Sequence, residues 1–366
     1  MSSNEKTFDV AVLPGDGIGI EVMESALAVL RAAEEKVGGF KLDCNTLPAG
    51  AIHYRDHGVA MPDASWAACD KADAILLGAI GWPEVRYPDG TEIITQVELR
   101  IRLGLYGGVR PIRHIGGRKP ILADPRAEKI DFILVRESTE GLFAGMTTGE
   151  VIDDAVAHDR MTITRDVSER LFDLSFRLAQ KRKGDGYAGK LTLVDKANIF
   201  RSMAFFRKVF DERAANFPDI ETERLYVDAC ALDLVRRPWD FDVMVTENMF
   251  GDILSDLGAG LIGGMGFAPS ADIGDNNAVF QPSHGTAPDI AGTGKANPTA
   301  MILSAAMMLD WLADRHDVPA CADAAKAIDD AMVAALAEGR ITPYDRGGED
   351  GTWAITEAVV KLLQDG

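Results

Sequence analysis

Short apolar runs and longer stretches of helical periodicity alternate along the chain. The apolar runs end in glycine or polar turns, and they predict strands over residues 8–15, 72–80, 131–138, 189–195, 224–229 and 241–247. The helical stretches predict helices over residues 20–39, 166–183, 198–215, 298–316 and 353–364. Such regular alternation of strands with helices predicts an α/β protein.

Composition narrows the class of protein. The chain has 366 residues and a formal net charge of −19, which suits two domains and disfavours a nucleic-acid or anionic-membrane partner. The longest apolar run, near residues 299–309, is too short to span a bilayer, and the first residues pass directly into a strand, so we expect no targeting segment. The cysteines are far apart in the sequence and lack metal-ligand spacing; they are Cys44, Cys69, Cys230 and Cys321. We therefore predict that they are free thiols and that the protein is cytoplasmic.

The glycine-rich turn GDGIG, residues 15–19, joins the first predicted strand to the first predicted helix. Its glycines are spaced GxGxG, and no acidic residue ends a second strand at the distance that a Rossmann βαβ unit requires. Tight turns need glycine for conformational reasons alone. We therefore predict no Rossmann cofactor site at this turn.

Two acids, Asp252 and Asp256, lie about one helical turn apart in an otherwise apolar segment, so both would share one helix face. A solvated pair is the ordinary interpretation of this spacing. Here the segment follows a short buried strand, and we expect residues 258–274 after it to form a long glycine-rich loop. This setting favours a divalent-cation site, since a cation would turn the repulsion between the carboxylates into binding.

Three arginines, Arg100, Arg110 and Arg136, occur on or beside apolar strands instead of in charged runs. A guanidinium holds a carboxylate through two parallel hydrogen bonds, so the three together would suit a dicarboxylate ligand. Ordinary surface or ion-paired arginines are the alternative for each one taken alone.

Two further polar residues stand in apolar surroundings. Lys196 follows a predicted strand and would serve as a proton donor or hold a water, and Asp228 is a candidate metal ligand or base.

Residues 284–300 are predicted to form a long loop of small residues, and loops of this length inside a compact domain usually bind a ligand or have another function. Its His284 would stack on a nucleotide or hydrogen-bond to it, although a single loop histidine is more often structural.

Six segments together resemble the isopropylmalate and isocitrate dehydrogenase family of β-decarboxylating 2-hydroxy acid dehydrogenases. They are residues 12–22, 99–111, 193–200, 226–229, 246–256 and 281–300. The resemblance runs from about residue 8 to the end of the chain. It implies a two-domain α/β fold with a mixed sheet and a non-Rossmann cofactor site.

In this resemblance, residues 1–105 plus 263–366 would form the cofactor-binding domain, and residues 106–262 the substrate, metal and dimerisation domain. The protein would be a homodimer with shared active sites, in which each site takes Lys196 and Asp228 from the partner subunit. The three arginines would bind the substrate carboxylates, and Asp252 and Asp256, with Asp228, would hold Mg²⁺ or Mn²⁺.

The resemblance also implies a cofactor loop, with the contacts His284, Gly285, Thr286, Ala287, Asp289, Ile290 and Asn297. The family's NADP-dependent members usually place Lys-Tyr where this chain has Asp289 and Ile290. An aspartate would accept the ribose hydroxyls and repel a 2′-phosphate, so NAD is the expected cofactor.

Several residues depart from the family pattern. Phe143 replaces the tyrosine that usually protonates the enolate, and Gln281 replaces a glutamate, for which the sequence alone offers no account. Near the substrate's C3 substituent, Ile94 and Gln96 disfavour isocitrate as the substrate, whereas Val97 keeps an apolar wall.

The implied activity is NAD- and metal-dependent oxidative decarboxylation of a 3-substituted (2R)-malate. The leading substrate is 3-isopropylmalate, which would give 4-methyl-2-oxopentanoate and CO₂ in leucine biosynthesis. D-Malate or tartrate is the alternative, because Gln96 adds a polar group to the substrate wall. A non-catalytic regulatory or dicarboxylate-binding paralogue is a lesser alternative, raised by Phe143.

Overall fold

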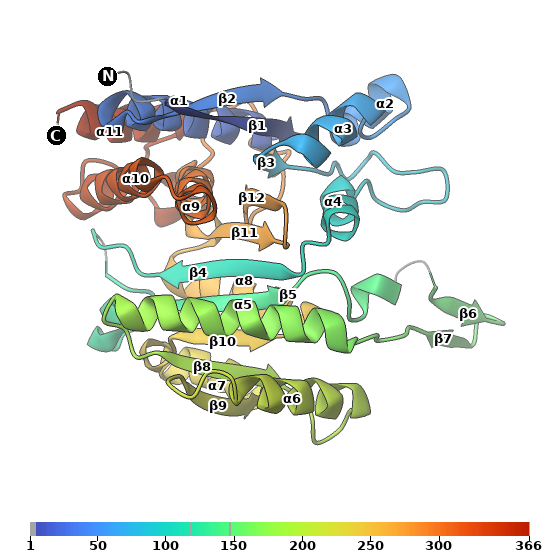
Figure 1. The fold of residues 1–366 in the computed structure, drawn as a ribbon. Coiled ribbons are helices and arrows are strands. Elements are labelled where there is room, and N and C mark those ends of the chain that lie inside the picture. The colour runs from blue at the N-terminus through green and yellow to red at the C-terminus, as the bar shows by residue number, and fades with distance from the viewer. Residues whose placement is uncertain (1–4, 118, 146–147, 366) are drawn as a thin grey trace.

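The computed structural model describes residues 5–117, 119–145 and 148–365. Within these residues, ten strands form one sheet in the order β2-β1-β3-β12-β11-β4-β5-β10-β8-β9 (Figure 1). The strands of this sheet are β1 (Lys6–Gly15), β2 (Phe40–Thr46), β3 (Ala74–Ala79), β4 (Gly107–Arg113), β5 (Asp131–Glu137), β8 (Lys190–Asp195), β9 (Glu221–Tyr226), β10 (Val243–Thr246), β11 (Pro269–Ile273) and β12 (Ala278–Pro282).

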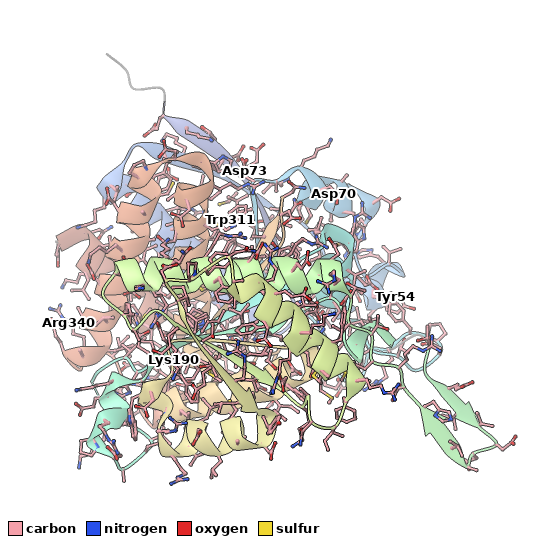
Figure 2. The ribbon with its side chains drawn as sticks, turned by 60° about the horizontal axis from the view of Figure 1, so that its bottom comes forward. Tyr54, Asp70, Asp73, Lys190, Trp311 and Arg340 are labelled. Atoms are coloured by element: carbon pink, nitrogen blue, oxygen red, sulfur yellow. The ribbon has the colours of Figure 1, made fainter. Side chains whose placement is uncertain are left out.

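Along the sequence, most α-helices of the described chain lie between these strands. They are α1 (Gly19–Val37), α2 (Ala51–His57), α3 (Asp63–Lys71), α4 (Thr95–Leu103), α5 (Arg165–Gly184), α6 (Arg201–Ala214), α7 (Val227–Arg236), α8 (Asn248–Ile262), α9 (Thr299–His316), α10 (Pro319–Ala337) and α11 (Thr352–Asp365). A separate two-stranded arm, β6 (Glu150–Ile152) with β7 (Val156–His158), projects from the body in the views of Figure 1 and Figure 2.

The sheet consists of two parallel groups joined through antiparallel strands. Strands β1, β2, β3 and β12 run parallel to one another, and so do β5, β10, β8 and β9. Between the groups, β11 is antiparallel to both β12 and β4, and β4 is antiparallel to β5. The predicted α/β fold with a mixed sheet is confirmed.

Helices cover both faces of the central strands. Helix α5 lies in front of β5 and β10 in Figure 1, and α8 lies behind them. Strand β3 is buried at every position, as a strand covered on both faces should be. One hydrophobic cluster runs through the whole sheet, with smaller clusters between residues 11 and 105 plus Val279 and between residues 106 and 245. The division into two domains stays a prediction.

Two sequence-based expectations about elements are wrong. Residues 258–274 are not a long loop, because α8 continues to Ile262, a 3-10 turn covers Met265–Phe267 and β11 follows. Asp228 does not lie in a strand, since β9 ends at Tyr226 and Asp228 lies in the first turn of α7. The glycine content of residues 258–274 resembled a loop, and the short apolar run before Asp228 resembled a strand that continues through it.

The GDGIG turn has a structural role. The carboxylate of Asp16 is buried and accepts hydrogen bonds from the backbone N–H groups of Ala51 (2.7 Å), Ile52 (2.9 Å) and Gly81 (2.9 Å). It therefore fixes the start of α2 and the segment after β3. Gly17 has a φ of 58°, and a Cβ there would lie 2.1 Å from the carbonyl oxygen of Thr286.

At this close approach, a hydrogen bond joins the GDGIG turn to the loop that contains Thr286. The backbone N–H of Ile18 donates to the carbonyl oxygen of Thr286 at 2.9 Å. The glycines of residues 15–19 thus allow the first turn to pack against the loop before α9, and no dinucleotide fingerprint is needed to explain them.

Other observations concern the chain as a whole. No helix among the described residues is long and apolar enough to cross a membrane. All the cysteines are free thiols, as predicted.

We predict that Asp16→Asn lowers the free energy of unfolding by about 2–4 kcal/mol, because an amide group would face buried backbone donors. Urea unfolding followed by circular dichroism measures this change. Asp43→Asn, at an exposed aspartate of β2, is the matched control and should stay within about 0.5 kcal/mol of the wild type. Equal losses in the two variants would contradict the anchoring role of Asp16.

Candidate active site

A cavity of about 240 Å³ lies over one face of the central strands, bounded by α4, α8 and the segments after β3 and β12. Most residues predicted to bind substrate or metal line it: Gln96, Val97, Arg100, Arg110, Arg136, Phe143, Asp252 and Asp256. His284 and Gly285 of the predicted cofactor loop line it too. Residues far apart in the sequence are therefore gathered at one place.

Strand register brings two of the arginines to the same face. Arg136 of β5 pairs with Gly108 of β4, and Arg110 follows two positions after Gly108, so all three lie on one side of the sheet. Gly108 adds no side chain between the arginines; a Cβ there would lie 2.6 Å from Ser138 Oγ. Arg100 comes instead from helix α4, one turn before its end.

The carboxylate of Asp272 lies beneath the arginines, where the sequence analysis had expected a loop. Asp272 is 0% exposed and accepts hydrogen bonds from Arg100 Nε (2.9 Å), Gln281 Nε2 (2.6 Å) and Ser138 Oγ (3.2 Å). Burial alone would raise its pKa, but the guanidiniums of Arg100, Arg110 and Arg136 outweigh burial and hold the pKa below its usual value. Asp272 is therefore a fixed negative charge under the cavity.

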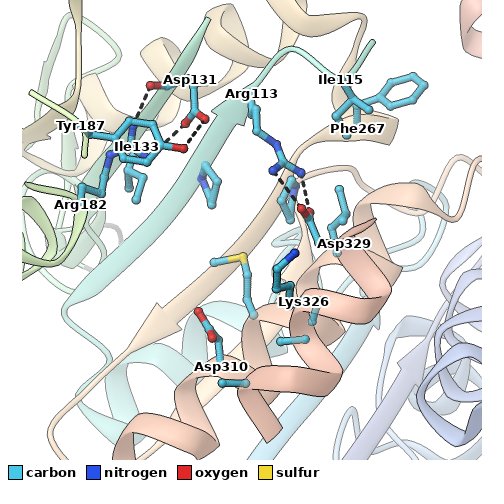
Figure 3. Close-up of a pocket in the computed structure, with 17 residues that line it drawn as sticks. Arg113, Ile115, Asp131, Ile133, Arg182, Tyr187, Phe267, Asp310, Lys326 and Asp329 are labelled. Atoms are coloured by element: carbon cyan, nitrogen blue, oxygen red, sulfur yellow. Dashed lines mark hydrogen bonds and ion pairs between the residues drawn. The ribbon is translucent and has the colours of Figure 1, made fainter. Parts of the chain in front are cut away.

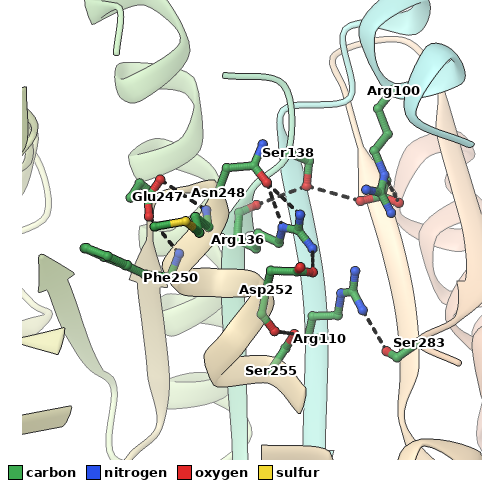
Figure 4. Close-up of polar contacts among 12 residues, drawn as sticks. Arg100, Arg110, Arg136, Ser138, Glu247, Asn248, Phe250, Asp252, Ser255 and Ser283 are labelled. Atoms are coloured by element: carbon green, nitrogen blue, oxygen red, sulfur yellow. Dashed lines mark hydrogen bonds and ion pairs between the residues drawn. The ribbon is translucent and has the colours of Figure 1, made fainter. Parts of the chain in front are cut away.

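Arg136 is held from two sides (Figure 4). Its Nε and Nη2 donate to Asn248 Oδ1 at 2.9 and 2.7 Å, and its Nη1 donates to Asp252. Its guanidinium carbon lies 5.2 Å from the centre of the Phe143 ring, within range of a cation–π contact. Sequence reasoning missed Asn248, the first residue of α8.

Arg110 keeps donors that the protein does not use. Its Nη1 donates to Ser283 Oγ at 2.8 Å, whereas its buried Nε has no hydrogen-bond partner among the described residues. Burial lowers its pKa to about 10, which leaves the group charged at neutral pH. A buried cation with an unused donor in a cavity wall suits an anionic ligand.

The two predicted acids share one face of α8, one turn apart, and both line the cavity. Glu247 starts this helix by accepting hydrogen bonds from the N–H groups of Phe250 (2.7 Å) and Met249 (3.1 Å). Burial, and next the charge of Asp252, raises the pKa of Asp256. Within the described part of a single chain, no group of three acidic, histidine or cysteine side chains is placed to hold a metal.

Lys196 and Asp228 lie outside this cavity but contact each other. Lys196 follows β8, and its Nζ lies 2.5 Å from Asp228 Oδ1. The hydrogen bond from Lys196 lowers the pKa of Asp228. The chain thus brings these two predicted residues together as a pair, and neither lines the cavity that contains Asp252 and Asp256.

A second cavity, of about 290 Å³, adjoins the first through His284, which lines both. Its wall includes the predicted cofactor residues Ile290 and Asn297, with Ile18 and Tyr344. Of the other predicted loop residues, Thr286 is buried, Ala287 half-buried and Asp289 exposed.

Two side chains of this second cavity differ in how they are held. The His284 Nδ1 lies 2.8 Å from the carbonyl oxygen of Gly285, its buried Nε2 has no partner among the described residues, and burial lowers its pKa. The Asn297 amide donates to the Asp345 carboxylate at 3.0 and 3.1 Å and its oxygen accepts from the N–H of Thr299. His284 therefore offers a free ring nitrogen, whereas Asn297 is already bonded within the protein.

The opposite face of the same strands carries another cavity, of about 340 Å³ (Figure 3). Its charged side chains are bonded within the protein: Arg113 to Asp329, and Arg182 to Asp131. This cavity contains none of the predicted site residues. The unpartnered atoms of Arg110 and His284 lie instead in the first cavity, which is the better candidate for a ligand site.

Comparisons with known proteins agree with this geometry. A family described as isocitrate/isopropylmalate dehydrogenase matches residues 9–361. The chain is 41% identical to the 3-isopropylmalate dehydrogenase of Archaeoglobus fulgidus, over 97% of this chain and 99% of that protein. It is 38% identical to the 3-isopropylmalate/3-methylmalate dehydrogenase of Methanocaldococcus jannaschii, over the same shares of the two chains.

Solved structures give the same result. The isocitrate dehydrogenase from Methylococcus capsulatus is similar with a TM-score of 0.85 and 35% identity, over 98% of this chain and 99% of that one. A β-decarboxylating dehydrogenase from Thermococcus kodakarensis has a TM-score of 0.79 and 33% identity, over 98% and 96% of the two chains.

Proposed function

The chain belongs to the isocitrate/isopropylmalate dehydrogenase family of oxidoreductases, and on that premise we propose that it oxidatively decarboxylates a 3-substituted (2R)-malate, with 3-isopropylmalate as the leading substrate. One observation carries the proposal. Three buried or nearly buried arginines and two aspartates, from four separate elements, line a single cavity of about 240 Å³.

The arginines supply recognition of a dicarboxylate. Arg110 has an unused buried Nε, and Arg100 spends only its Nε on Asp272 within the described chain, so both retain donors for carboxylate oxygens. Arg136 is fixed by Asn248 and by the Phe143 ring. Together they would hold the two substrate carboxylates and leave C2 and C3 between the acids and the cofactor loop.

The acids fit a hard divalent cation. Asp252 and Asp256 present carboxylate oxygens from one helix face, and burial together with the charge of Asp252 raises the pKa of Asp256, so a bound cation would offset the repulsion between them. Asp252 is half-exposed, and its bond to Arg136 leaves its second oxygen for a ligand. Mg²⁺ or Mn²⁺ bound here, with Asp228 of a second subunit, would polarise the substrate hydroxyl and its neighbouring carboxylate.

The loop before α9 fits NAD. The second cavity has an apolar wall, adjoins the substrate cavity and contains the free ring nitrogen of His284. Exposed Asp289 would accept the ribose hydroxyls and repel a 2′-phosphate. Bound NAD would accept the hydride that leaves C2 of the substrate.

Proton transfer falls to Lys196 and Asp228 of the neighbouring subunit. The two are already hydrogen-bonded to each other, and neither lines its own chain's cavity. A homodimer is supported by exposed apolar side chains on α7, α8, the segment after β8 and the arm: Ile199, Phe200, Leu232, Val235, Ile253, Val151, Ile152 and Val156. In such a dimer Asp228 or Lys196 would take the C2 hydroxyl proton, directly or through water.

Phe143 carries no group that can protonate the enolate left after CO₂ is lost. Its ring stacks near Arg136 and lines the cavity, so here it supports the arginine. We assign enolate protonation at C3 to Lys196 or to a water that it holds.

Gln96 favours a second candidate, a D-malate or tartrate dehydrogenase. Its side chain lines the substrate cavity, and its buried Oε1 has no hydrogen-bond partner among the described residues. An unpaired amide in the wall would suit a smaller or hydroxylated C3 substituent better than an isopropyl group.

Two further assignments remain part of the proposal. Residues 1–105 plus 263–366 would bind the cofactor, and residues 106–262 would bind metal and form the dimer. The free cysteines are those of a protein in a reducing compartment, and we propose the cytoplasm.

The first prediction is turnover with NAD and Mn²⁺. The purified protein should form NADH and CO₂ in equal amounts from 3-isopropylmalate, faster than from D-malate, tartrate or isocitrate, and should use NADP poorly. Faster turnover of D-malate or tartrate would favour the second candidate. NADH without CO₂ would mean a stalled β-keto acid, and no turnover of any substrate would favour a non-catalytic paralogue.

Mn²⁺ should raise the thermal stability of the wild type. At about 100 times its dissociation constant a ligand stabilises the native state by about 2.7 kcal/mol. Asp252→Asn should lose most of this Mn²⁺-induced shift in melting temperature, because the cation loses a charged ligand. Asp323→Asn, an exposed aspartate of α10, should keep the shift. An unchanged shift in Asp252→Asn would remove Asp252 from the metal site.

Phe143→Tyr tests the proton donor. If decarboxylation is limited by enolate protonation, the new hydroxyl should raise the rate of 2-keto acid formation by about 100-fold or more, as general acids do. Stopped-flow measurement of NADH and CO₂ separates this step from hydride transfer. A lower rate would mean that the cavity is organised around phenylalanine and that Lys196 or water already serves.

A further inference from the structure

Two buried side chains at the base of the cavity, Asp272 and Gln281, have no role in the reaction as described so far; Gln281 lines the cavity, whereas Asp272 does not. Asp272 lies in β11, which is next to the arginine-bearing β4, and Gln281 lies in β12, on the other side of β11. Neither side chain is more than 6% exposed. Their contacts, however, lead directly to the substrate arginines.

The first contact orients Arg100. Its Nε donates to Asp272 Oδ2 at 2.9 Å, and Asp272 is its only ion-pair partner in the described chain. Because Nε lies at one end of the planar guanidinium, this bond fixes the plane of the group and leaves both terminal nitrogens for a ligand. Figure 4 shows the Arg100 side chain extending from its helix toward the strands of the sheet.

The second contact explains Gln281. Its Nε2 donates to the same Asp272 Oδ2 at 2.6 Å, so the oxygen has an amide donor and a guanidinium donor. A glutamate at this position would bring two carboxylates within hydrogen-bond distance of each other, and they would have to share a proton. Glutamine has nearly the same size as glutamate, but its amide can donate a hydrogen bond to Asp272.

The charges in and under the cavity are also matched. Arg100, Arg110 and Arg136 stand against Asp252, Asp256 and Asp272, one guanidinium for each carboxylate. A divalent cation and a doubly negative substrate would then enter together without leaving a buried net charge. A further carboxylate at Gln281 would break this balance.

We propose that Asp272 and Gln281 are a positioning pair, in which Asp272 orients Arg100 for one substrate carboxylate and the uncharged Gln281 keeps the cavity neutral for a dicarboxylate bound with its cation. This inference rests on the proposed function for the identity of the ligand. It adds that Asp272 and Gln281 act as one unit, because they share a hydrogen bond and their combined charge sets that of the cavity base.

The test for orientation is Asp272→Asn, which keeps the shape and removes the charge. Calorimetry measures the affinity for 3-isopropylmalate with Mn²⁺ and, separately, for inorganic sulfate. We expect 3-isopropylmalate to bind about tenfold more weakly, as on losing a hydrogen bond to a charged group, and sulfate to bind equally or more tightly, because a negative charge has gone. Weakening of both ligands would indicate only structural damage, and tightening of both only a charge effect; either result overturns the orienting role.

The test for charge is Gln281→Glu, read as a pH profile. At low pH the new carboxyl group is protonated and still donates to Asp272, so both ligands should bind within about threefold of the wild type. As pH rises and this carboxyl group ionises, repulsion should weaken both by about tenfold or more, whereas the wild-type profile should change less. A variant whose ligand affinities follow the wild-type profile would overturn the role of Gln281.

The double variant Asp272→Asn/Gln281→Glu moves the carboxylate to the other end of the same hydrogen bond. Affinity for 3-isopropylmalate should recover to within about threefold of the wild type, since donor, acceptor and total charge are restored. Losses that simply add, in a protein with wild-type circular dichroism, would overturn the pair. Calorimetry needs no turnover. If the wild type oxidises none of the substrates, the proposed function is refuted, but the binding ratios still test the pair. If the wild type binds neither ligand, the pair is refuted as well.

Discussion

The ion pair in the middle of the sheet between the Asp272 carboxylate and Arg100, reinforced by the nearby charges of Arg110 and Arg136, is the interaction on which the candidate site depends. Arginines are costly to bury, and three within one cavity would repel one another strongly without a counter-charge. A carboxylate that is 0% exposed cannot be screened by water, so its attraction for Arg100 is at its strongest there. The same bond that offsets the cost of burial also fixes the geometry of the cavity.

The mixed sheet makes this arrangement possible. Two parallel groups of strands meet through antiparallel β11 and β4, so the site lies on the face of the central strands and not at one edge. Side chains alternate between faces along each strand, which places Arg110 over the substrate cavity and Pro111 in the cavity behind it. Gly108 leaves the space in which Asp272 and Ser138 bond.

Much of this could be predicted from the sequence, and the exceptions have physical causes. Asp252, Asp256 and the arginines stood out because charged residues interrupted apolar patterns. Asp272 did not, because one aspartate in a glycine-rich stretch resembles a turn residue until its partners from α4 and β12 are known. Helix α10 was missed because its many alanines favour a helix without marking a hydrophobic face. The pairing of Lys196 with Asp228 depends on the neighbouring ends of β8 and β9, which sequence spacing does not reveal.

The hydrogen bond from the Ile18 N–H to the Thr286 carbonyl limits how the loop before α9 can be redesigned. The predicted cofactor loop is not an interchangeable module, because its backbone rests on the GDGIG turn at a distance that only glycine tolerates. A loop transplanted from an NADP-dependent relative would carry its new side chains but would have to keep the old backbone path at Thr286. Replacement of the predicted cofactor loop therefore involves two segments from distant parts of the sequence, and a graft that ignores the GDGIG turn transfers only half of the unit.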